Sequence, residues 1–410
     1  MLVIGVLIIA TLSLIPNSLY RNSGARPSVG GAYVSPQDSA SARTTLSGGK
    51  PEFDAASWYA ERGEEPEAHG VMIESVNHDR LFASHNADQV FNPASLIKLA
   101  TSLVALKKLG ADYRFRTRIY TEGETDNSGT LHGQLYVIGG DPNFGDVAAG
   151  VIGNELRARG IKRLEGTINV SPDFCFNYSE SAEESADRLA KALRLGDVRT
   201  GISGEPTSGL LFAFSAYELR DVLLYMNAHS SNFVAERVGA LVGGAAGVQQ
   251  FLIDELRLPP DQVTISRVSG REHNRMTPRG LLEVIRALVE ETKRQGLEPA
   301  DIMPVASDDS GTLRRRLMGT PLEGAVIAKT GTLTAEVDGG MASLAGIVYT
   351  EDAGLVLFAI LDQGNRIWDH RQMEDQLLAE VVTTKTRPRA FGVPPQRQLL
   401  PSSTVRIERG

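Results

Sequence analysis

A single cysteine, Cys175, in a chain of 410 residues limits how this protein can be stabilised. One cysteine excludes an intramolecular disulfide and any metal site built on a pair of thiolates. The seven histidines show no zinc-ligand spacing, so we predict no metal site. Hydrophobic residues make up 42% of the chain, as is usual for a protein with a substantial core. The sequence therefore predicts a fold that depends on core packing alone.

The charge balance of the chain is mildly acidic. The 42 Lys and Arg residues and 50 Asp and Glu residues give a net charge of −8 and a sequence pI near 5.5. Because a nucleic-acid-binding protein normally has a basic surface, we expect no nucleic-acid partner. At about 150 residues per domain, the length predicts two or three domains.

An uncharged apolar run occupies residues 2–15. It is shorter than the about 20 residues of a membrane-spanning helix and is typical of the apolar region of a secretory signal, although no Lys or Arg precedes it. The following residues, up to about 50, are rich in Ser, Gly and Pro and resemble a linker. We therefore predict export to the periplasm or cell envelope, with residues 1–52 as a signal or anchor segment and a linker. The sequence leaves open whether residues 2–15 are removed, giving a soluble protein, or remain as a membrane tether; a buried element of the fold is the alternative.

Helical and β-type patterns divide the rest of the chain. Asn92-Pro93 is a favourable helix start and Gly110 a favourable helix end, which predicts a largely apolar helix over residues 94–109. Strand patterns between residues 112 and 208 interrupt the helices on either side and predict an inserted α+β module. The predicted domains are a split domain of residues 53–111 and 209–382, an insert of residues 112–208, and a mobile tail of residues 383–410.

The first candidate catalytic motif is Ser95-x-x-Lys98, at the start of the predicted helix. Residues three apart on a helix lie on one face, one turn apart. A Ser hydroxyl needs a base within hydrogen-bond distance, and a Lys that is desolvated in an apolar helix tends to be neutral. Lys98 is therefore a candidate base for Ser95, and the N–H groups at the helix start can bind an oxyanion. The alternative is a helix-start Ser with a Lys that reaches solvent.

The second motif is Ser230-Ser231-Asn232, at a break between two predicted helices. Side chains two residues apart in an extended segment point the same way and can enter one cleft. Ser230 can then pass a proton to a leaving group, and Asn232 can hold a substrate amide. Helix capping by Ser or Asn is the alternative interpretation.

The third motif is Lys329-Thr330-Gly331-Thr332, which follows a β-type run. A Lys at a strand edge offers a fixed positive charge to a carboxylate, and the hydroxyls of Thr330 and Thr332 add polar contacts. Gly331 allows a ligand to approach the backbone closely. The N–H of Thr332 is a candidate oxyanion donor beside that of Ser95. A solvent-exposed Lys before a Gly turn is the alternative.

The order of these motifs resembles that of the penicillin-recognising serine enzymes. Further segments are similar to the class C, low-molecular-mass penicillin-binding proteins, the serine D-alanyl-D-alanine carboxypeptidase/endopeptidase family, and the similarity covers most of residues 53–382. These segments are residues 91–95, 139–142, 161–166, 226–227, 311–313 and 329–333. The resemblance implies an α+β, β-lactamase-like transpeptidase fold, with an antiparallel sheet flanked by helices and a helical subdomain. Residues 268–274 match the family's Asp-Gly-Ser-Gly-Leu-Ser-like loop only in part, through Ser269-Gly270.

The resemblance also implies a reaction on peptidoglycan stem peptides. Ser95 attacks the carbonyl of the penultimate D-Ala, and Lys98 accepts its proton. The N–H groups of Ser95 and Thr332 hold the oxyanion, Ser230 returns a proton to the departing D-Ala, and Lys329 with the Thr hydroxyls binds the terminal carboxylate. Water then hydrolyses the acyl-enzyme without a cofactor or metal, and β-lactam antibiotics are expected as covalent inhibitors.

Two other functions are compatible with these motifs. One is a β-lactamase or esterase on the same scaffold, although no Glu-x-x-Leu-Asn-type segment is present to position a deacylating water. The other is a non-catalytic peptidoglycan-binding relative, which the altered loop at residues 268–274 favours and the intact motif residues oppose. The sequence also leaves open the balance between carboxypeptidase and endopeptidase activity.

Overall fold

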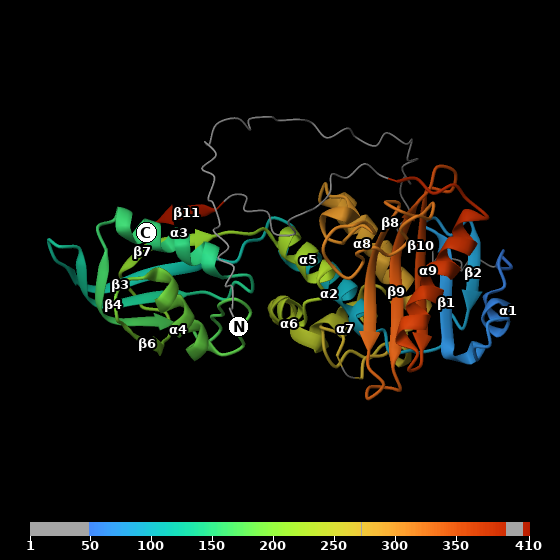
Figure 1. The fold of residues 1–410 in the computed structure, drawn as a ribbon, viewed down its shortest axis with the longest axis horizontal. Coiled ribbons are helices and arrows are strands. Elements are labelled where there is room, and N and C mark those ends of the chain that lie inside the picture. The colour runs from blue at the N-terminus through green and yellow to red at the C-terminus, as the bar shows by residue number, and fades with distance from the viewer. Residues whose placement is uncertain (1–48, 272, 391–404) are drawn as a thin grey trace, which may run out of the picture. The chain divides into compact units, whose positions relative to one another are not determined.

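The computed structural model of the protein describes residues 49–271, 273–390 and 405–410. Two β-sheets with their helices organise these residues (Figure 1). Almost all of the predicted signal and linker segment lies outside the described residues. Within the described ranges, no helix combines the length and apolar character that crossing a membrane requires.

The first sheet has five strands in the order β2-β1-β10-β9-β8, and every neighbouring pair is antiparallel. It joins segments that are far apart in the sequence, because β1 pairs with β10. The strands are β1 (His69–Ser75), β2 (Leu81–His85), β8 (Val326–Leu333), β9 (Met341–Tyr349) and β10 (Leu355–Gln363). The sheet therefore assembles the two sequence halves that were predicted to form one split domain.

Helices cover both faces of this sheet. Alternate residues of a strand point to opposite faces, so in β8 Ile327 packs with helices α2 and α8, whereas Val326 and Ala328 pack on the side of α9. The helices are α1 (Ala55–Ala60), α2 (Ile97–Leu109), α8 (Pro278–Arg294) and α9 (Ile367–Thr383). An antiparallel sheet flanked by helices confirms the α+β fold class predicted from the sequence.

Helix α2 is enclosed by helices on several sides, which explains its apolar character. It packs against α5 (Leu219–Ala228), α6 (Asn232–Leu241) and α7 (Gly244–Asp254) as well as α8. Helix α5 begins at Leu219 because Glu218 and Asp221 form a capping box there. The short 3-10 turn η2 (Ala94–Leu96) precedes α2.

The second sheet lies mostly within the predicted insert. Its six strands follow the order β11-β7-β3-β4-β5-β6, with parallel pairing only between β4 and β5 and between β5 and β6. Parallel neighbouring strands need a crossover connection, and here one helix connects β4 to β5 and a second connects β5 to β6. The elements are β3 (Thr117–Thr125), β4 (Thr130–Ile138), α3 (Asp146–Ala158), β5 (Arg163–Val170), α4 (Ala182–Leu193), β6 (Arg199–Ile202), β7 (Leu210–Ser215) and β11 (Arg406–Arg409).

The second sheet corrects two boundaries predicted from the sequence. Strand β7 belongs to it, so the module extends past residue 208. Strand β11 pairs with β7, with Ile407 opposite Phe214, so residues 406–409 do not belong to a mobile tail. An edge strand such as β7 leaves backbone N–H and C=O groups unpaired, and β11 satisfies them.

Candidate active site

The first motif lies where η2 leads into α2. The side chain of Asn92 accepts a hydrogen bond from the Ala94 N–H at 3.0 Å, and Ala94 has a left-handed backbone with φ of +50°. Ser95 is half-buried in the 3-10 turn, whereas Lys98 is fully buried in the first turn of α2. The local backbone therefore leaves Ser95 partly exposed and keeps the Lys98 side chain in the interior.

The Lys98 amine joins the first two motifs. Its Nζ atom lies 3.0 Å from Ser95 Oγ and 2.8 Å from Asn232 Oδ1. It also donates a hydrogen bond to the backbone carbonyl of Ser269. Burial lowers the pKa of Lys98 from its ordinary value to about 7. A neutral amine beside the Ser95 hydroxyl is thus present in quantity near neutral pH, as a general base requires.

Ser230 lies in the turn between α5 and α6 and contacts the third motif. Lys329 Nζ donates a hydrogen bond to Ser230 Oγ at 2.9 Å and another to the Thr330 carbonyl at 2.5 Å. Lys329 is fully buried, and burial together with the nearby Lys98 holds its pKa well below the usual value. The structure therefore brings Ser230 to Lys329, while Asn232 contacts Lys98.

The strand β8 packs closely on the turn that contains Ser95 because of Gly331. A Cβ atom at this position would lie 2.2 Å from Ser343 Oγ and 3.0 Å from the Ala94 Cβ. Ser343 in turn donates a hydrogen bond to the Pro93 carbonyl at 3.2 Å. Thus a glycine is required at position 331 because any side chain there would prevent β8 from packing against the turn that contains Ser95.

The two threonines of the third motif differ in exposure. Thr330 is buried, whereas Thr332 is exposed and donates its hydroxyl to the Gly331 carbonyl at 2.7 Å. Their strand, β8, is an edge strand of the five-stranded sheet. The first part of its open side is paired, through a bridge between Val305 and Ile327 and a hydrogen bond from the Ala328 N–H to the Pro304 carbonyl. Beyond this bridge, backbone N–H groups on the open side of an edge strand are able to bind a ligand.

The loop of residues 266–271 is a part of the site that the sequence motifs did not identify. The Ser269 carbonyl accepts hydrogen bonds from Lys98 and, at 3.4 Å, from Ser95 Oγ. Gly270 follows with φ of +88°, and a Cβ atom there would lie 2.2 Å from the Ala94 carbonyl oxygen. The Ser269-Gly270 pair, the part of this loop that matches the family pattern, was the available signal.

Replacement of Gly270 by Ala is expected to disturb both stability and acylation. The side chain would be strained at this φ and would also collide with the backbone before Ser95, a displacement for which we expect about a 100-fold loss of acylation rate. Gly160 is the matched control, because its φ is +89° and nothing lies within 4 Å of its Cβ position. Gly160→Ala should cost about 1–2 kcal/mol of stability and leave acylation unchanged. Thermal unfolding and penicillin acylation rates measure both effects, and equal behaviour of the two variants would contradict the account.

A groove of about 660 Å³ opens beside these residues. Its lining includes Asn232, Glu236, Ser269 and Arg271. The groove therefore gives an extended ligand access to residues that contact the Lys98 amine.

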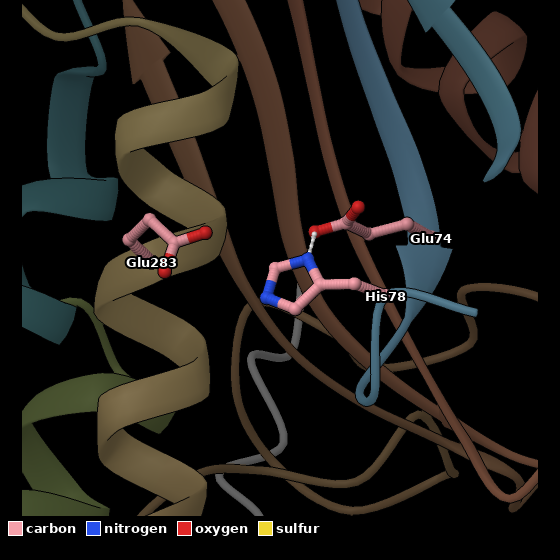
Figure 2. A group of neighbouring side chains, drawn as sticks. All are labelled: Glu74, His78 and Glu283. Carbon is pink, nitrogen blue, oxygen red and sulfur yellow. Dashed lines mark ion pairs between the residues drawn. The ribbon is translucent and has the colours of Figure 1, made fainter. Parts of the chain in front are cut away.

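A second polar cluster lies between β1 and α8, where Figure 2 shows the His78 ring turned toward Glu74, with Glu283 on the neighbouring helix. Among the described residues, these three form the group with ligand atoms spaced closely enough for a metal ion. His78 Nδ1 lies 3.1 Å from Glu74 Oε1, and Arg286 donates to the same oxygen. Arg286 Nε is also 3.6 Å from Glu283. Because the guanidinium compensates both carboxylates, we interpret the cluster as an ion network that joins β1 to α8.

The fold and the site together define a class of protein. A serine and a buried lysine at a helix start, a Ser-x-Asn turn between helices, and a Lys-Thr-Gly segment on an edge strand are the arrangement of penicillin-recognising serine enzymes. The chain belongs to the D-Ala-D-Ala carboxypeptidase 3 (S13) family, whose model matches residues 56–187 and 171–384. This assignment confirms the family expected from the motifs.

Sequence similarity to curated proteins is confined to part of the chain. A D-alanyl-D-alanine carboxypeptidase of Actinomadura sp. (strain R39) is 27% identical over 153 residues, 34% of this chain and 28% of that protein. The D-alanyl-D-alanine carboxypeptidase DacB of Haemophilus influenzae is 28% identical over 100 residues, 24% of this chain and 21% of the relative. The matches thus span less than a third of either relative.

Similarity of fold to solved structures covers more of the chain than the sequence similarity does. The predatory endopeptidase Bd3459 of Bdellovibrio bacteriovorus, solved with the immunity protein Bd3460, superposes with a TM-score of 0.71 at 18% identity, over 83% of this chain and 99% of that one. Penicillin binding protein 4 (dacB) of Haemophilus influenzae gives a TM-score of 0.62 at 19% identity, over 76% of this chain and 96% of the other. At these identities the comparison establishes a shared fold.

Proposed function

We propose that this protein is a serine D-Ala-D-Ala carboxypeptidase that acts on peptidoglycan stem peptides through an acyl-enzyme on Ser95. The observation that carries the proposal is the buried Lys98 amine, 3.0 Å from the hydroxyl of the half-buried Ser95 and with a pKa lowered to about 7. A serine with such a base beside it is an activated nucleophile. Membership of the S13 family supports the same activity.

In the acylation step, Ser95 Oγ bonds to the carbonyl carbon of the penultimate D-Ala and its proton passes to neutral Lys98. The N–H groups of Ser95 and Thr332 are the proposed donors to the oxyanion. The C–N bond to the terminal D-Ala then breaks, Ser230 transfers its hydroxyl proton to the leaving amine, and the proton that Lys98 took from Ser95 replaces it at Ser230. Asn232, which contacts Lys98, also lies in the groove and is available to the amide of the bound peptide.

The terminal carboxylate of the substrate is proposed to bind at Lys329, Thr330 and Thr332, beside Gly331. Lys329 is buried with a depressed pKa, and an incoming carboxylate would favour its charged form. Substrate binding and protonation of Lys329 are therefore expected to be coupled. In the second step, the oxygen of a water molecule bonds to the acyl carbon, the bond between that carbon and Ser95 Oγ breaks, and a proton of the water passes through Lys98 to Ser95 Oγ, with no cofactor or metal required.

β-Lactam antibiotics are the proposed covalent inhibitors of the same serine. Bd3459 has been solved acylated by penicillin G, and the Haemophilus penicillin binding protein 4 complexed with a β-lactam. Bd3459 is described as a peptidoglycan endopeptidase, so cleavage of cross-links is a second activity to test here. Activity on peptidoglycan would require export, which residues 2–15 are proposed to direct, as a cleaved signal or as a membrane tether.

Release of D-Ala from diacetyl-Lys-D-Ala-D-Ala tests the proposal. We expect catalytic release of one D-Ala per peptide, with slower turnover of nitrocefin, because β-lactams are trapped as the acyl-enzyme. Faster nitrocefin turnover would instead indicate a β-lactamase. A folded protein that releases no D-Ala and binds no penicillin covalently would indicate a non-catalytic relative. Cross-linked muropeptide dimers, tested in parallel, measure the endopeptidase activity.

A further inference from the structure

The Ser269 carbonyl contacts both residues of the first motif, although none of the three candidate catalytic motifs contains it. Lys98 donates to this oxygen, and Ser95 Oγ lies 3.4 Å from it. A carbonyl in this position fixes the direction of the Lys98 amine as well as accepting its hydrogen bond. The position of the carbonyl therefore matters for how Lys98 meets Ser95.

The loop that carries this carbonyl is fixed by side chains. Thr101 Oγ1 donates to the Val268 carbonyl at 3.1 Å, and Asn274 Oδ1 accepts from the Ser266 N–H at 2.9 Å. At the critical residue, the Ser269 N–H donates to Glu236 Oε1 at 3.2 Å. Hence the carboxylate of Glu236 holds the residue whose carbonyl contacts Lys98.

Glu236 and Asn232 lie four residues apart on α6. Residues at this spacing share one face of a helix, and both line the same groove. Asn232 binds the Lys98 amine directly, at 2.8 Å, whereas Glu236 reaches it through Ser269. One face of α6 thus positions the Lys98 amine in two ways, directly through Asn232 and indirectly through Glu236.

We propose that Glu236 is a positioning residue of this site, which holds the Ser269 carbonyl against the Lys98 amine and so orients that amine toward Ser95. The inference rests on the proposed acyl-transfer function and adds to it a residue outside the three motifs. Glu236 acts through Ser269 and does not touch the reacting atoms.

The charges around Lys98 support this role independently of the loop geometry. Burial is the main cause of its lowered pKa; the carboxylate of Glu236 raises the pKa and the guanidinium of Arg271 lowers it. Lys329, from β8, is a further titratable group whose charge interacts with the amine. Glu236 therefore raises the pKa of Lys98, whereas burial and the Arg271 guanidinium lower it.

Two substitutions separate the charge of Glu236 from its hydrogen bond. Glu236→Gln keeps an oxygen acceptor for the Ser269 N–H but removes the charge that favours protonated Lys98. Without this charge the pKa of Lys98 should fall, so the neutral amine that acts as base is present at lower pH. In a plot of acylation rate against pH, the rising part at acidic pH (the acid limb) should therefore move to lower pH, whereas the maximal rate (the plateau) should change little. Glu236→Ala also removes the acceptor, and we expect a plateau rate about 10-fold to 100-fold lower.

The experiment is the second-order rate of acylation by penicillin from pH 5 to 9 in the full chain, with thermal unfolding measured on each variant. Arg271→Gln should shift the acid limb in the opposite direction, to higher pH, and Glu255→Gln, an exposed residue after α7, should not shift it. A merely structural role would lower stability without moving the limb.

The inference is overturned if Glu236→Gln leaves the acid limb in place and a folded Glu236→Ala keeps the wild-type rate. Absence of acylation in the wild-type protein would instead refute the proposed function itself. The two failures are therefore distinguishable.

Discussion

Replacing Ser95 by Ala is expected to abolish covalent labelling by a fluorescent penicillin and release of D-Ala, while the protein remains folded. The substitution removes only the hydroxyl that contacts Lys98 and the Ser269 carbonyl, at a half-buried position. No other group at this position can form the acyl bond. Labelling is read on a denaturing gel, and thermal unfolding verifies the fold.

A control serine distinguishes this effect from a general Ser-to-Ala effect. Ser128 lies in an exposed turn of the second sheet and bonds Asp126, so Ser128→Ala should label as the wild type does. Equal labelling of wild type and Ser95→Ala, or labelling of neither, would contradict the assignment of the nucleophile.

The second large effect is expected from Lys98→Met. Met resembles the Lys side chain in length and suits a fully buried position, so the substitution removes the base with little loss of packing. General-base catalysis contributes about 10²-fold to 10⁴-fold, and we expect a loss of acylation rate in this range. In the wild type the rate should rise with pH through about 7, as Lys98 becomes neutral, and this dependence should disappear in the variant.

Lys107→Met provides the matched control for the base. Lys107 is on the same helix, but its side chain is exposed and lies 3.6 Å from Glu291. Its replacement should change neither the rate nor the pH profile. A Lys98→Met protein that keeps the wild-type pH dependence would show that another group, such as Lys329, is the base.

Much of the catalytic domain could be predicted because its elements carry strong local signals. The predicted helix over residues 94–109 ends where α2 ends, since Gly110 adopts φ of +85° after Leu109. The β-type run before Lys329 also corresponds to the start of β8. Buried strands and a buried helix have continuous apolar sequences, which local patterns describe well.

Other elements depended on signals that were missed or are absent. Helix α4 has a capping pattern, Ser181-x-x-Glu184, and the Ser181 side chain accepts from the Glu184 N–H, so its start was readable. Strand β11 has no comparable signal. Its four residues are exposed and mostly charged, and it exists because β7 supplies an open edge.

The candidate site divides in the same way. Side chains with distinctive chemistry at fixed spacing, such as Ser95 and Lys98, could be assigned from the sequence, and their contact is a consequence of helix geometry. The Ser269-Gly270 match pointed only to the loop. The contact of the Ser269 carbonyl with Lys98 could not be predicted, because every residue has a carbonyl and its place here depends on how the loop folds against α2. The sequence offered one indication for Glu236, its four-residue spacing from Asn232. This spacing could not be interpreted without the structure, in which Glu236 accepts a hydrogen bond from the Ser269 N–H.

The measurement that tests the central claim most directly is mass spectrometry of the protein after incubation with penicillin. The account predicts one equivalent of bound drug, located by peptide mapping on Ser95, and none after Ser95→Ala. An adduct on a different residue, or a folded wild-type protein that gains no mass, would contradict the claim that Ser95 is the acylated nucleophile of this site.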